Sequence, residues 1–384
     1  MRILMLDNEF PPLGGGMGVV NQAILQNFSR RSGLEIDLIT SALEGKFIQE
    51  QFSEHIRIYK VPVCNKNIHH SSNRELTLYG TQALWWGLRL HRARRYDFCF
   101  AWSVVPAGAV AWLLQKLYHL PYLVVVSGPD IPGFEQRYHN LYKFIAPLIR
   151  TVWRHASPLI VQSQEEAALV HTVVKDQPLE IIPNGVDISR FKPGFPIPDD
   201  GTLKILCAAR LIERKGQHYL IQVLKRLLDD GVEVELNLAG TGDSLGMYQK
   251  LTDDLGVTNR VHFLGVVPRE EMPGVYAASH VFSLPSFNEG MSMAALEAMG
   301  SGLPLVLTRT GGTSELVEEG VNGFTHDWGD VDALAGHLRR LAQDRPLTRQ
   351  MGEASRHRSE QFSWEAISER YLELFARLTK LEVG

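Results

Sequence analysis

Residues 204–239, KILCAARLIERKGQHYLIQVLKRLLDDGVEVELNLA, carry the pattern that predicts the fold. Residues 204–208 and 233–239 have the apolar character of strands, and residues 216–229 between them have the character of a helix. Two strands that are joined through a helix of more than ten residues run parallel, with a right-handed crossover. The stretch therefore predicts an α/β architecture.

The same alternation runs through both halves of the chain. Further strands are expected at residues 3–6, 36–40, 56–63, 97–102, 122–126, 159–162, 261–264, 281–284 and 305–307, and further helices at 76–95, 106–118, 134–155, 164–174, 245–255 and 270–278. Residues 364–378 form an amphipathic helix candidate after a loosely structured approach. Both halves are therefore predicted to be Rossmann-like, with a doubly wound parallel sheet in each.

A segment rich in proline divides the chain. At 384 residues the protein is long enough for two domains of ordinary size. Pro183, Pro193, Pro196, Pro198 and Gly201 punctuate a segment that can be neither helix nor central strand, so the hinge is expected there. The predicted domains are residues 1–187 and 188–360, followed by a C-terminal helix over 361–384 that packs back towards the N-terminal domain.

Composition excludes several classes of protein. Hydrophobic residues make up 45% of the chain and charged residues 21%, as in ordinary globular enzymes. The formal net charge of −4 gives no general case for a nucleic-acid partner. Three widely spaced cysteines argue against a disulfide framework. Without a signal-peptide pattern or an apolar run of about 18 residues, the chain is expected in the cytosol.

One helix candidate raises the question of membrane contact. Within residues 76–95, Arg89, Arg92, Arg94 and Arg95 lie near two neighbouring tryptophans, at positions 85 and 86. Basic and aromatic side chains together suit a membrane interface. A basic helix C-terminus that complements the helix dipole is the alternative explanation.

Two turns at the ends of predicted strands have both a structural and a functional interpretation. The loop 11–18, with Gly15 and Gly16, lets backbone amides approach a ligand, or is a plain flexible turn. In the turn 127–133, Asp130 is the single ionisable residue. It is either an acid/base or acceptor-hydroxyl ligand, or a residue that shapes the turn.

The stretch 287–304, FNEGMSMAALEAMGSGLP, combines a glycine, a predicted helix start and two glutamates, Glu289 and Glu297. Gly290 after Glu289 lets the backbone come close to a ligand, and the following residues favour a helix whose N-terminus can hold a phosphate. A carboxylate such as Glu289 or Glu297 can accept hydrogen bonds from vicinal hydroxyls. The two glutamates therefore suit a sugar and a ribose better than a metal, and no metal site is predicted.

Arg210 and Lys215 supply positive charge directly after the strand candidate 204–208. A guanidinium binds phosphate through two parallel hydrogen bonds, and an ammonium acts as a point charge. Together they could neutralise a diphosphate, including the charge that grows on it as a leaving group.

In combination these motifs resemble the retaining GT-B glycosyltransferases of glycosyltransferase family 4, the group 1 transferases. The resemblance covers nearly the whole chain. It rests on the glycine loop 14–18, the segment 183–187, Arg210 with Lys215 and Gly216, the turn 240–242, the stretch 289–304, and the glycine-containing segments 311–315 and 320–323.

The resemblance implies two Rossmann-like domains that face a central cleft, and transfer of a sugar with retention without an obligatory metal or cofactor. Arg210 and Lys215 would hold the donor diphosphate, Glu297 the ribose and Glu289 the transferred sugar. Amides of Gly290, Met291 and Ser292 would face the sugar or phosphate, Gly15 and Gly16 would close over the phosphate, and Val266 and Val267 would lie near the base.

The chain departs from the family pattern at one position. The family usually has a histidine near the end of the strand at 122–126, where this chain has Ser127-Gly-Pro-Asp130, which leaves Asp130 as the local substitute. The expected partners are a nucleotide-sugar donor and a glycan, lipid-linked or small-molecule acceptor. A sugar-nucleotide epimerase, or a catalytically silent sugar-nucleotide-binding protein, is the alternative on the same architecture.

Overall fold

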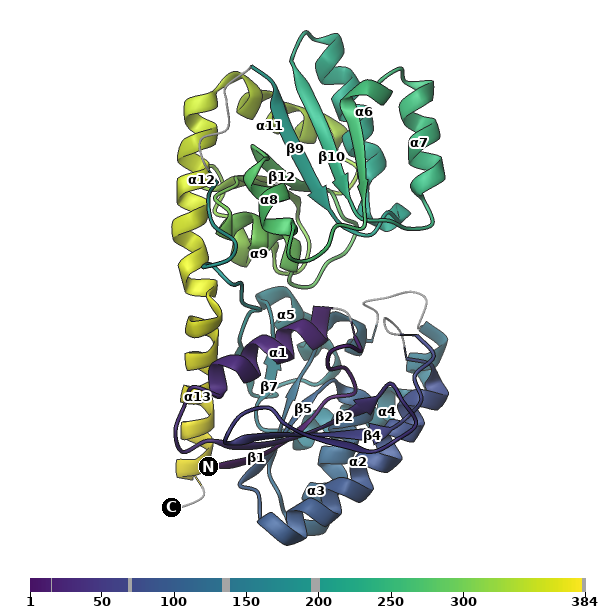
Figure 1. Cartoon of the computed structure of the whole chain (residues 1–384), viewed down its shortest axis with the longest axis vertical. Helices are drawn as coiled ribbons and strands as arrows, with labels where there is room; N and C mark the ends of the chain where they lie inside the picture. Colours follow the sequence, from purple (N-terminus) through teal and green to yellow (C-terminus); the bar gives the residue numbers. More distant parts are fainter. Residues whose placement is uncertain (15, 68–70, 133–138, 195–200, 382–384) are drawn as a thin grey trace. The chain divides into compact units, whose positions relative to one another are not determined.

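A computed structural model describes residues 1–384 except 15, 68–70, 133–138, 195–200 and 382–384 (Figure 1). The chain divides into two compact units. The first comprises Met1–Pro183 and Ile367–Gly384, and the second comprises Asn184–Ala366. The C-terminal segment thus belongs to the unit that begins at the N-terminus.

The first unit is built on a sheet with the strand order β3-β4-β2-β1-β5-β6-β7-β8. Its strands are β1 (Arg2–Leu6), β2 (Glu35–Ala42), β3 (Ile48–Gln51), β4 (Ile56–Pro62), β5 (Phe98–Trp102), β6 (Tyr122–Val125), β7 (Leu159–Val161) and β8 (Leu179–Ile181). All described pairings are parallel except that of β3 with β4. The expected all-parallel sheet is therefore corrected at one edge, by a short and mostly exposed polar strand that the apolar pattern could not reveal.

Helices cover both faces of this sheet (Figure 1). They are α1 (Gly16–Phe28), α2 (Asn73–Arg94), α3 (Ala109–Tyr118), α4 (His139–His155), α5 (Gln164–Val173) and α13 (Trp364–Leu381), with the short turns η1 (Val104–Gly108) and η2 (Gly128–Asp130). Helices α2, α3, α4 and α5 contribute to one buried cluster with the strands. The predicted start of α4 at residue 134 lies outside the described residues.

On the face of the sheet opposite to this cluster, the C-terminal helix α13 packs into an aromatic core. Alternate residues of β5 point to this side, and the Phe375 ring lies 5.1 Å from the Phe98 ring and 5.3 Å from the Phe100 ring. Phe28 of α1 completes the cluster at 5.8 Å from Phe375. The last helix is therefore an integral part of the first unit's core.

The second unit has a sheet with the order β11-β10-β9-β12-β13-β14, and all its described pairings are parallel. The strands are β9 (Leu203–Ala208), β10 (Val234–Ala239), β11 (Val261–Gly265), β12 (Val281–Leu284), β13 (Leu305–Thr308) and β14 (Gly323–His326). The helices are α6 (Gln217–Asp229), α7 (Leu245–Asp254), α8 (Met272–Ala277), α9 (Met293–Gly300), α10 (Thr313–Leu316), α11 (Val331–Gln343) and α12 (Arg345–Ser359), with the turns η4 (Glu213–Lys215), η5 (Thr258–Arg260) and η6 (Glu360–Phe362).

The prediction that a loosely structured segment precedes residue 364 is wrong, because two helices, α11 and α12, form there. Asp344 caps α12 by accepting a hydrogen bond from Leu347 N at 2.9 Å. Later in this polar helix, the Arg356 guanidinium donates to the carbonyl oxygens of Phe191 and Gly300 at 2.9 and 2.7 Å. Contacts of this kind stabilise a helix whose own sequence has little apolar character.

Each sheet contains a point at which the strand order reverses. In the first sheet it lies between β1 and β5, and in the second between β9 and β12, which pair through Ile205 with Val281 and through Leu206 with Phe282. Open α/β sheets bind ligands outside the carboxyl ends of the strands at such a point. The loops after β9 and β12 are therefore the first place to look for a site in the second unit.

Candidate functional site

The loops that follow β9 and β12 are pressed against each other. Gly216 has a φ of +72°, and a Cβ on it would lie 2.0 Å from the Pro285 carbonyl oxygen. The Phe287 amide donates to the Arg214 carbonyl at 2.7 Å. Only glycine permits this approach, and it brings the cationic loop 210–216 to the acidic stretch that begins at residue 287.

Lys215 and Glu289 meet at this contact. Lys215 Nζ donates to Glu289 Oε1 in an ion pair, and Ser286 Oγ donates to the same oxygen at 2.5 Å. Both side chains of the ion pair are largely shielded from solvent. No hydrogen bond from the described residues reaches Glu289 Oε2, so one carboxylate oxygen fixes the lysine and the other can accept from a ligand.

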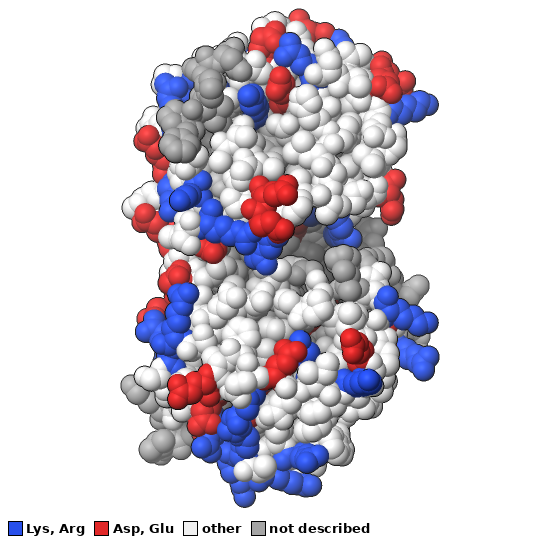
Figure 2. All heavy atoms as spheres, viewed as in Figure 1, with Lys and Arg blue, Asp and Glu red and all other residues white. Residues whose placement is uncertain are grey.

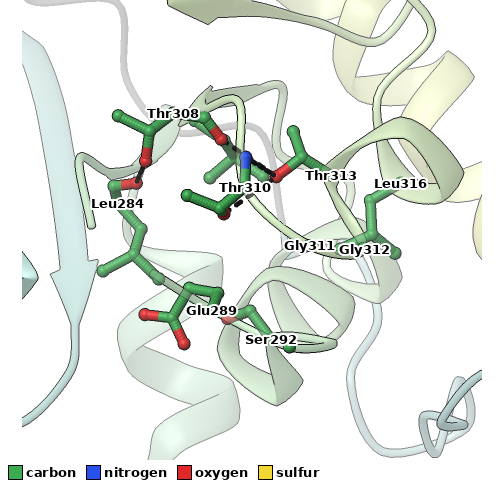
Figure 3. A pocket seen from close by; sticks show the side chains of 11 residues that line it. Leu284, Glu289, Ser292, Thr308, Thr310, Gly311, Gly312, Thr313 and Leu316 are labelled. Carbon is green, nitrogen blue, oxygen red and sulfur yellow. Dashed lines mark hydrogen bonds between the residues drawn. The ribbon is translucent and has the colours of Figure 1, made fainter. Parts of the chain in front are cut away.

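A third loop, after β13, closes a pocket beside Glu289 (Figure 3). Cβ atoms on Gly311 and Gly312 would lie 2.7 and 2.8 Å from the carbonyl oxygens of Glu289 and Gly290, so both glycines are needed for the contact. The pocket contains about 240 Å³ of empty space that includes open solvent. It is lined by Leu284, Glu289, Gly290, Ser292, Leu307, Thr308, Thr310, Gly311, Gly312, Thr313 and Leu316.

Three threonines order this third loop. Thr308 Oγ1 donates to the Ser286 carbonyl at 2.5 Å, and Thr313 Oγ1 donates to the Thr308 carbonyl at 2.9 Å. The hydroxyls of Thr310 and Thr313 lie 3.3 Å apart (Figure 3). The threonine hydroxyls thus hold the wall of the pocket to the strand ends through hydrogen bonds.

The N-terminus of α9 faces the same region. Ser292 is its N-cap and accepts a hydrogen bond from Ala295 N at 3.3 Å. Gly290 and Ser292 line the pocket, whereas Met291 is buried. Free amides at such a helix start, together with the positive end of the helix dipole, favour a phosphate or an electron-rich sugar oxygen.

Arg210 lies at the exposed end of the same β9 loop. Its guanidinium has no ion-pair partner among the residues that the structure describes. The turn 240–242 supports the loop from below, because Cβ atoms on Gly240 and Gly242 would lie 2.1 and 2.4 Å from the carbonyl oxygens of Ala209 and Leu211. The close backbone contacts explain why glycines occupy positions 240 and 242. The charge of Arg210 is available to a ligand.

Glu297 occupies a different environment, about one turn after the start of α9. Tyr276 Oη donates to Glu297 Oε2 at 2.9 Å. Burial raises the pKa of Glu297, while the hydrogen bond from Tyr276 and the charges of Arg269 and Arg190 act in the opposite direction. Arg190 also donates to the Arg269 carbonyl oxygen. The two glutamates thus have separate hydrogen-bond partners.

The predicted base-binding residues lie in the loop between β11 and α8. Val266 is 76% exposed, and Val267 is half-buried against the core of the second unit. Arg269 follows two residues later and is the nearest cation to Glu297 along this loop. Neither Val266 nor Val267 is among the described residues that line the pocket beside Glu289.

Three predicted site residues belong to the first unit. Gly16 is the exposed first residue of α1, and Gly15 lies outside the described residues. Asp130 ends the turn η2, where its carboxylate accepts hydrogen bonds from the Ser127 amide at 3.1 Å and from the Val104 amide at 3.2 Å. Burial raises the pKa of Asp130 to about 6. Asp130 therefore shapes this turn, and its catalytic role stays a prediction.

Sequence reasoning missed several residues of the site. Ser286 and Tyr276, which hold the two glutamates, and the threonines after β13 were not among the candidates. The signal for the threonines was present, because residues 308–313 follow a predicted strand and contain two adjacent glycines. Among the described residues there is no group of three or more His, Cys, Asp and Glu side chains that could hold a metal ion.

The chain matches two family models, one for each unit. Residues 15–185 match the glycosyl transferase 4-like domain, and residues 190–358 match the glycosyl transferases group 1. Together the models cover most of the chain.

Similar proteins extend over the full length. The D-inositol 3-phosphate glycosyltransferase of Corynebacterium jeikeium is 27% identical over 98% of this chain and 97% of its own length. The structure is similar to sucrose-phosphate synthase of Thermosynechococcus elongatus, with a TM-score of 0.83, 21% identity and coverage of 99% and 100% of the two chains. It is also similar to HepE of Anabaena in complex with UDP, with a TM-score of 0.76, 22% identity and coverage of 98% and 100%. HepE has been solved with UDP-glucose as well. These structural neighbours establish the GT-B fold.

Proposed function

Because the chain belongs to the group 1 glycosyltransferases, which use nucleotide sugars, we propose that it moves a hexose-type sugar from a nucleoside diphosphate to an acceptor hydroxyl with retention of configuration. The observation that carries this proposal is the ion pair of Lys215 with Glu289 at the reversal point of the second sheet. In this proposal Lys215 is the cation that binds the diphosphate, and Glu289 beside it is the carboxylate that binds the sugar.

The two cations act on the leaving group. Arg210, whose guanidinium is exposed, and Lys215 bind the donor diphosphate, and the amides at the start of α9 add hydrogen-bond donors. Negative charge grows on the β-phosphate as the bond from its oxygen to the anomeric carbon breaks. Donors that are already in position stabilise this charge at little reorganisation cost.

The carboxylates orient the donor. Glu289 keeps Oε1 on Lys215 and Ser286 and offers Oε2 to a hydroxyl of the transferred sugar. Glu297, held by Tyr276, accepts from the ribose hydroxyls. Each carboxylate has one oxygen fixed by the protein, which pre-organises the other for the ligand.

The new glycosidic bond forms on the face from which the diphosphate departs. The acceptor oxygen attacks the anomeric carbon, and its proton passes to the departing β-phosphate oxygen, so that no protein base is required. The proposal needs no metal or other cofactor, since the charges of Arg210 and Lys215 take that part.

The donor and acceptor are proposed by class. The UDP and UDP-glucose complexes of HepE support a uridine nucleotide, with GDP-sugars as the second group to examine. The acceptor is a glycan, a lipid-linked glycan or a small molecule. One relative is named for a small molecule, D-inositol 3-phosphate. A bacterial role in cell-surface polysaccharide or lipopolysaccharide synthesis, at the cytoplasmic face of the membrane, fits this chemistry.

Nucleotide sugars screened by thermal shift will identify the donor, because a ligand that binds the folded state raises the melting temperature. Transfer is then measured by nucleotide release and by the NMR coupling constant of the new anomeric proton. An α-linked product from an α-linked donor is expected. A β-linked product would contradict retention, an altered donor sugar without nucleotide release would indicate an epimerase, and a thermal shift without turnover would indicate a silent binding protein.

A further inference from the structure

A stripe of exposed apolar and basic side chains runs along α2. Arg74, Leu78, Trp85, Arg89 and Arg92 follow one another at intervals of three, four or seven residues, which places them on one side of the helix. All five are exposed. We call these five residues the α2 outer face.

The aromatic part of this face extends beyond the helix. Trp85 is 53% exposed, and its ring lies edge-on to that of Trp86 at 5.0 Å. Phe47, which is 39% exposed, stacks on Trp86 with ring centres 4.2 Å apart and planes 7° from parallel. Three neighbouring aromatic side chains are therefore gathered at the surface, and packing within the unit buries only part of their area.

Two of the three arginines of this face, Arg89 and Arg92, contact aromatic side chains and not carboxylates. The Arg89 guanidinium lies 5.5 Å from the Trp85 ring centre and 5.1 Å from that of Trp86. Arg92 donates to Tyr118 Oη at 2.6 Å. By contrast, Arg94 on the inner side pairs with Glu35 at 3.0 Å. The described residues give Arg89 and Arg92 no ion pair, so their positive charge is uncompensated.

No acidic side chain balances this charge on the two helices involved. The single acidic residue of α2 is Glu75, which is buried and accepts a hydrogen bond from the Ser72 amide at 2.6 Å in the capping box. The neighbouring helix α3 has no acidic residue and carries Lys116. In the loop before Phe47, Glu44 is offset by Lys46. Figure 2 shows Lys and Arg atoms gathered along the edge of the first unit at the bottom of the view.

We propose that the α2 outer face docks the protein on an anionic membrane surface. Tryptophan rings take positions at headgroup level, phenylalanine rings bury towards the acyl chains, and arginines beside them attract anionic lipids. With 22 residues, α2 provides a straight strip of roughly 33 Å on which both kinds of contact lie in one line. This inference is independent of the donor site, which lies in the other unit.

Sedimentation with vesicles tests the proposal. The full chain is mixed with vesicles of phosphatidylcholine, with and without phosphatidylglycerol, at low and at high salt. Binding to the anionic vesicles that weakens at high salt is expected. Because each arginine near such a surface contributes about 1 kcal/mol, the variant Arg74→Gln/Arg89→Gln/Arg92→Gln should bind about a hundredfold more weakly. Trp85→Ala should also weaken binding.

Matched controls separate docking from general effects. Met247→Ala removes an apolar side chain that is likewise 53% exposed, on α7 of the other unit, and should leave vesicle binding unchanged. All variants should keep the melting temperature and the turnover of soluble substrates. Equal binding to both kinds of vesicle, or unchanged binding by the triple variant, would overturn the proposal. So would an α2-dependent dimer, or binding of the face to an anionic glycan in place of vesicles.

Discussion

Lys215 Nζ and Glu289 Oε1 form a hydrogen-bonded ion pair although 74 positions separate the two residues in the sequence. The contact exists because β9 and β12 are neighbours at the reversal point of the second sheet, so that the loops after them emerge side by side. Gly216 then allows the two loops to touch. The cation that we propose for the phosphate and the carboxylate that we propose for a sugar hydroxyl are thus positioned by one another.

Glu289→Gln should reduce kcat about 10- to 100-fold, because the amide loses the charge that holds Lys215 and orients the sugar. The dissociation constant of the nucleoside diphosphate, which lacks the transferred sugar, should change little. Steady-state kinetics and nucleotide titration measure the two effects. Glu353→Gln, at an exposed position of α12, is the control. Full activity of Glu289→Gln would remove the sugar-orienting role from this residue.

Gly216→Ala should destabilise the second unit by about 3 kcal/mol, because a Cβ would clash with the Pro285 carbonyl and the residue has a positive φ. Gly231→Ala is a matched control, since Gly231 has a φ of +76° and nothing within 4 Å of the added Cβ. It should cost about 1 kcal/mol, the strain alone. Urea unfolding compares the two, and equal costs would show that the loop contact at Pro285 is unimportant.

Asp130→Asn should change the pH dependence of stability. Burial raises the pKa of Asp130 from 3.8 to about 6, so the folded protein holds this proton more tightly than the unfolded chain does. The contribution of Asp130 to the free energy of unfolding is therefore largest below pH 4 and falls as the pH rises to about 6, by at most about 3 kcal/mol. The asparagine variant should lack this decline in urea unfolding from pH 4 to 6.

The same variant separates the two roles considered for Asp130. Its carboxylate already accepts hydrogen bonds from Ser127 and Val104 within the turn, so kcat should stay within about tenfold of the wild-type value. A loss of more than about a hundredfold, with the fold intact, would instead assign Asp130 to acid/base chemistry at the acceptor.

Phe375→Ala should destabilise the first unit by about 3–5 kcal/mol, because the ring is fully buried among Phe28, Phe98 and Phe100. Phe144→Ala removes an 83% exposed ring from α4 of the same unit and should change stability by less than about 0.5 kcal/mol. Thermal unfolding measures both. A small loss for Phe375→Ala would mean that the C-terminal helix contributes little to this core.

Sequence alone predicted the central strands and most helices, because buried parallel strands appear as apolar runs. The prediction failed for segments whose secondary structure depends on tertiary contacts. Strand β3 is polar and lies at a sheet edge, and α12 depends on contacts such as those of Arg356, which no local pattern contains. Membership of the group 1 glycosyltransferases and the GT-B fold were both predicted correctly.

The candidate site shows the same division. Residue type and position after a strand selected Lys215 and Glu289, since phosphate and sugar hydroxyls require such groups. Their shared contact with Ser286, the support of Glu297 by Tyr276 and the threonine wall depend on how loops meet in space. Periodicity describes strands and helices and contains little information on loops.

The most direct measurement is sugar transfer by Lys215→Ala beside Lys250→Ala, which changes an exposed lysine on α7 that is not among the residues proposed to bind the donor. If Lys215 stabilises the departing diphosphate, the first variant should lose about 10²–10³-fold in kcat with the fold intact by circular dichroism, and the second should lose nothing. Near-normal turnover by Lys215→Ala would contradict the assignment of this sheet edge as the donor diphosphate site.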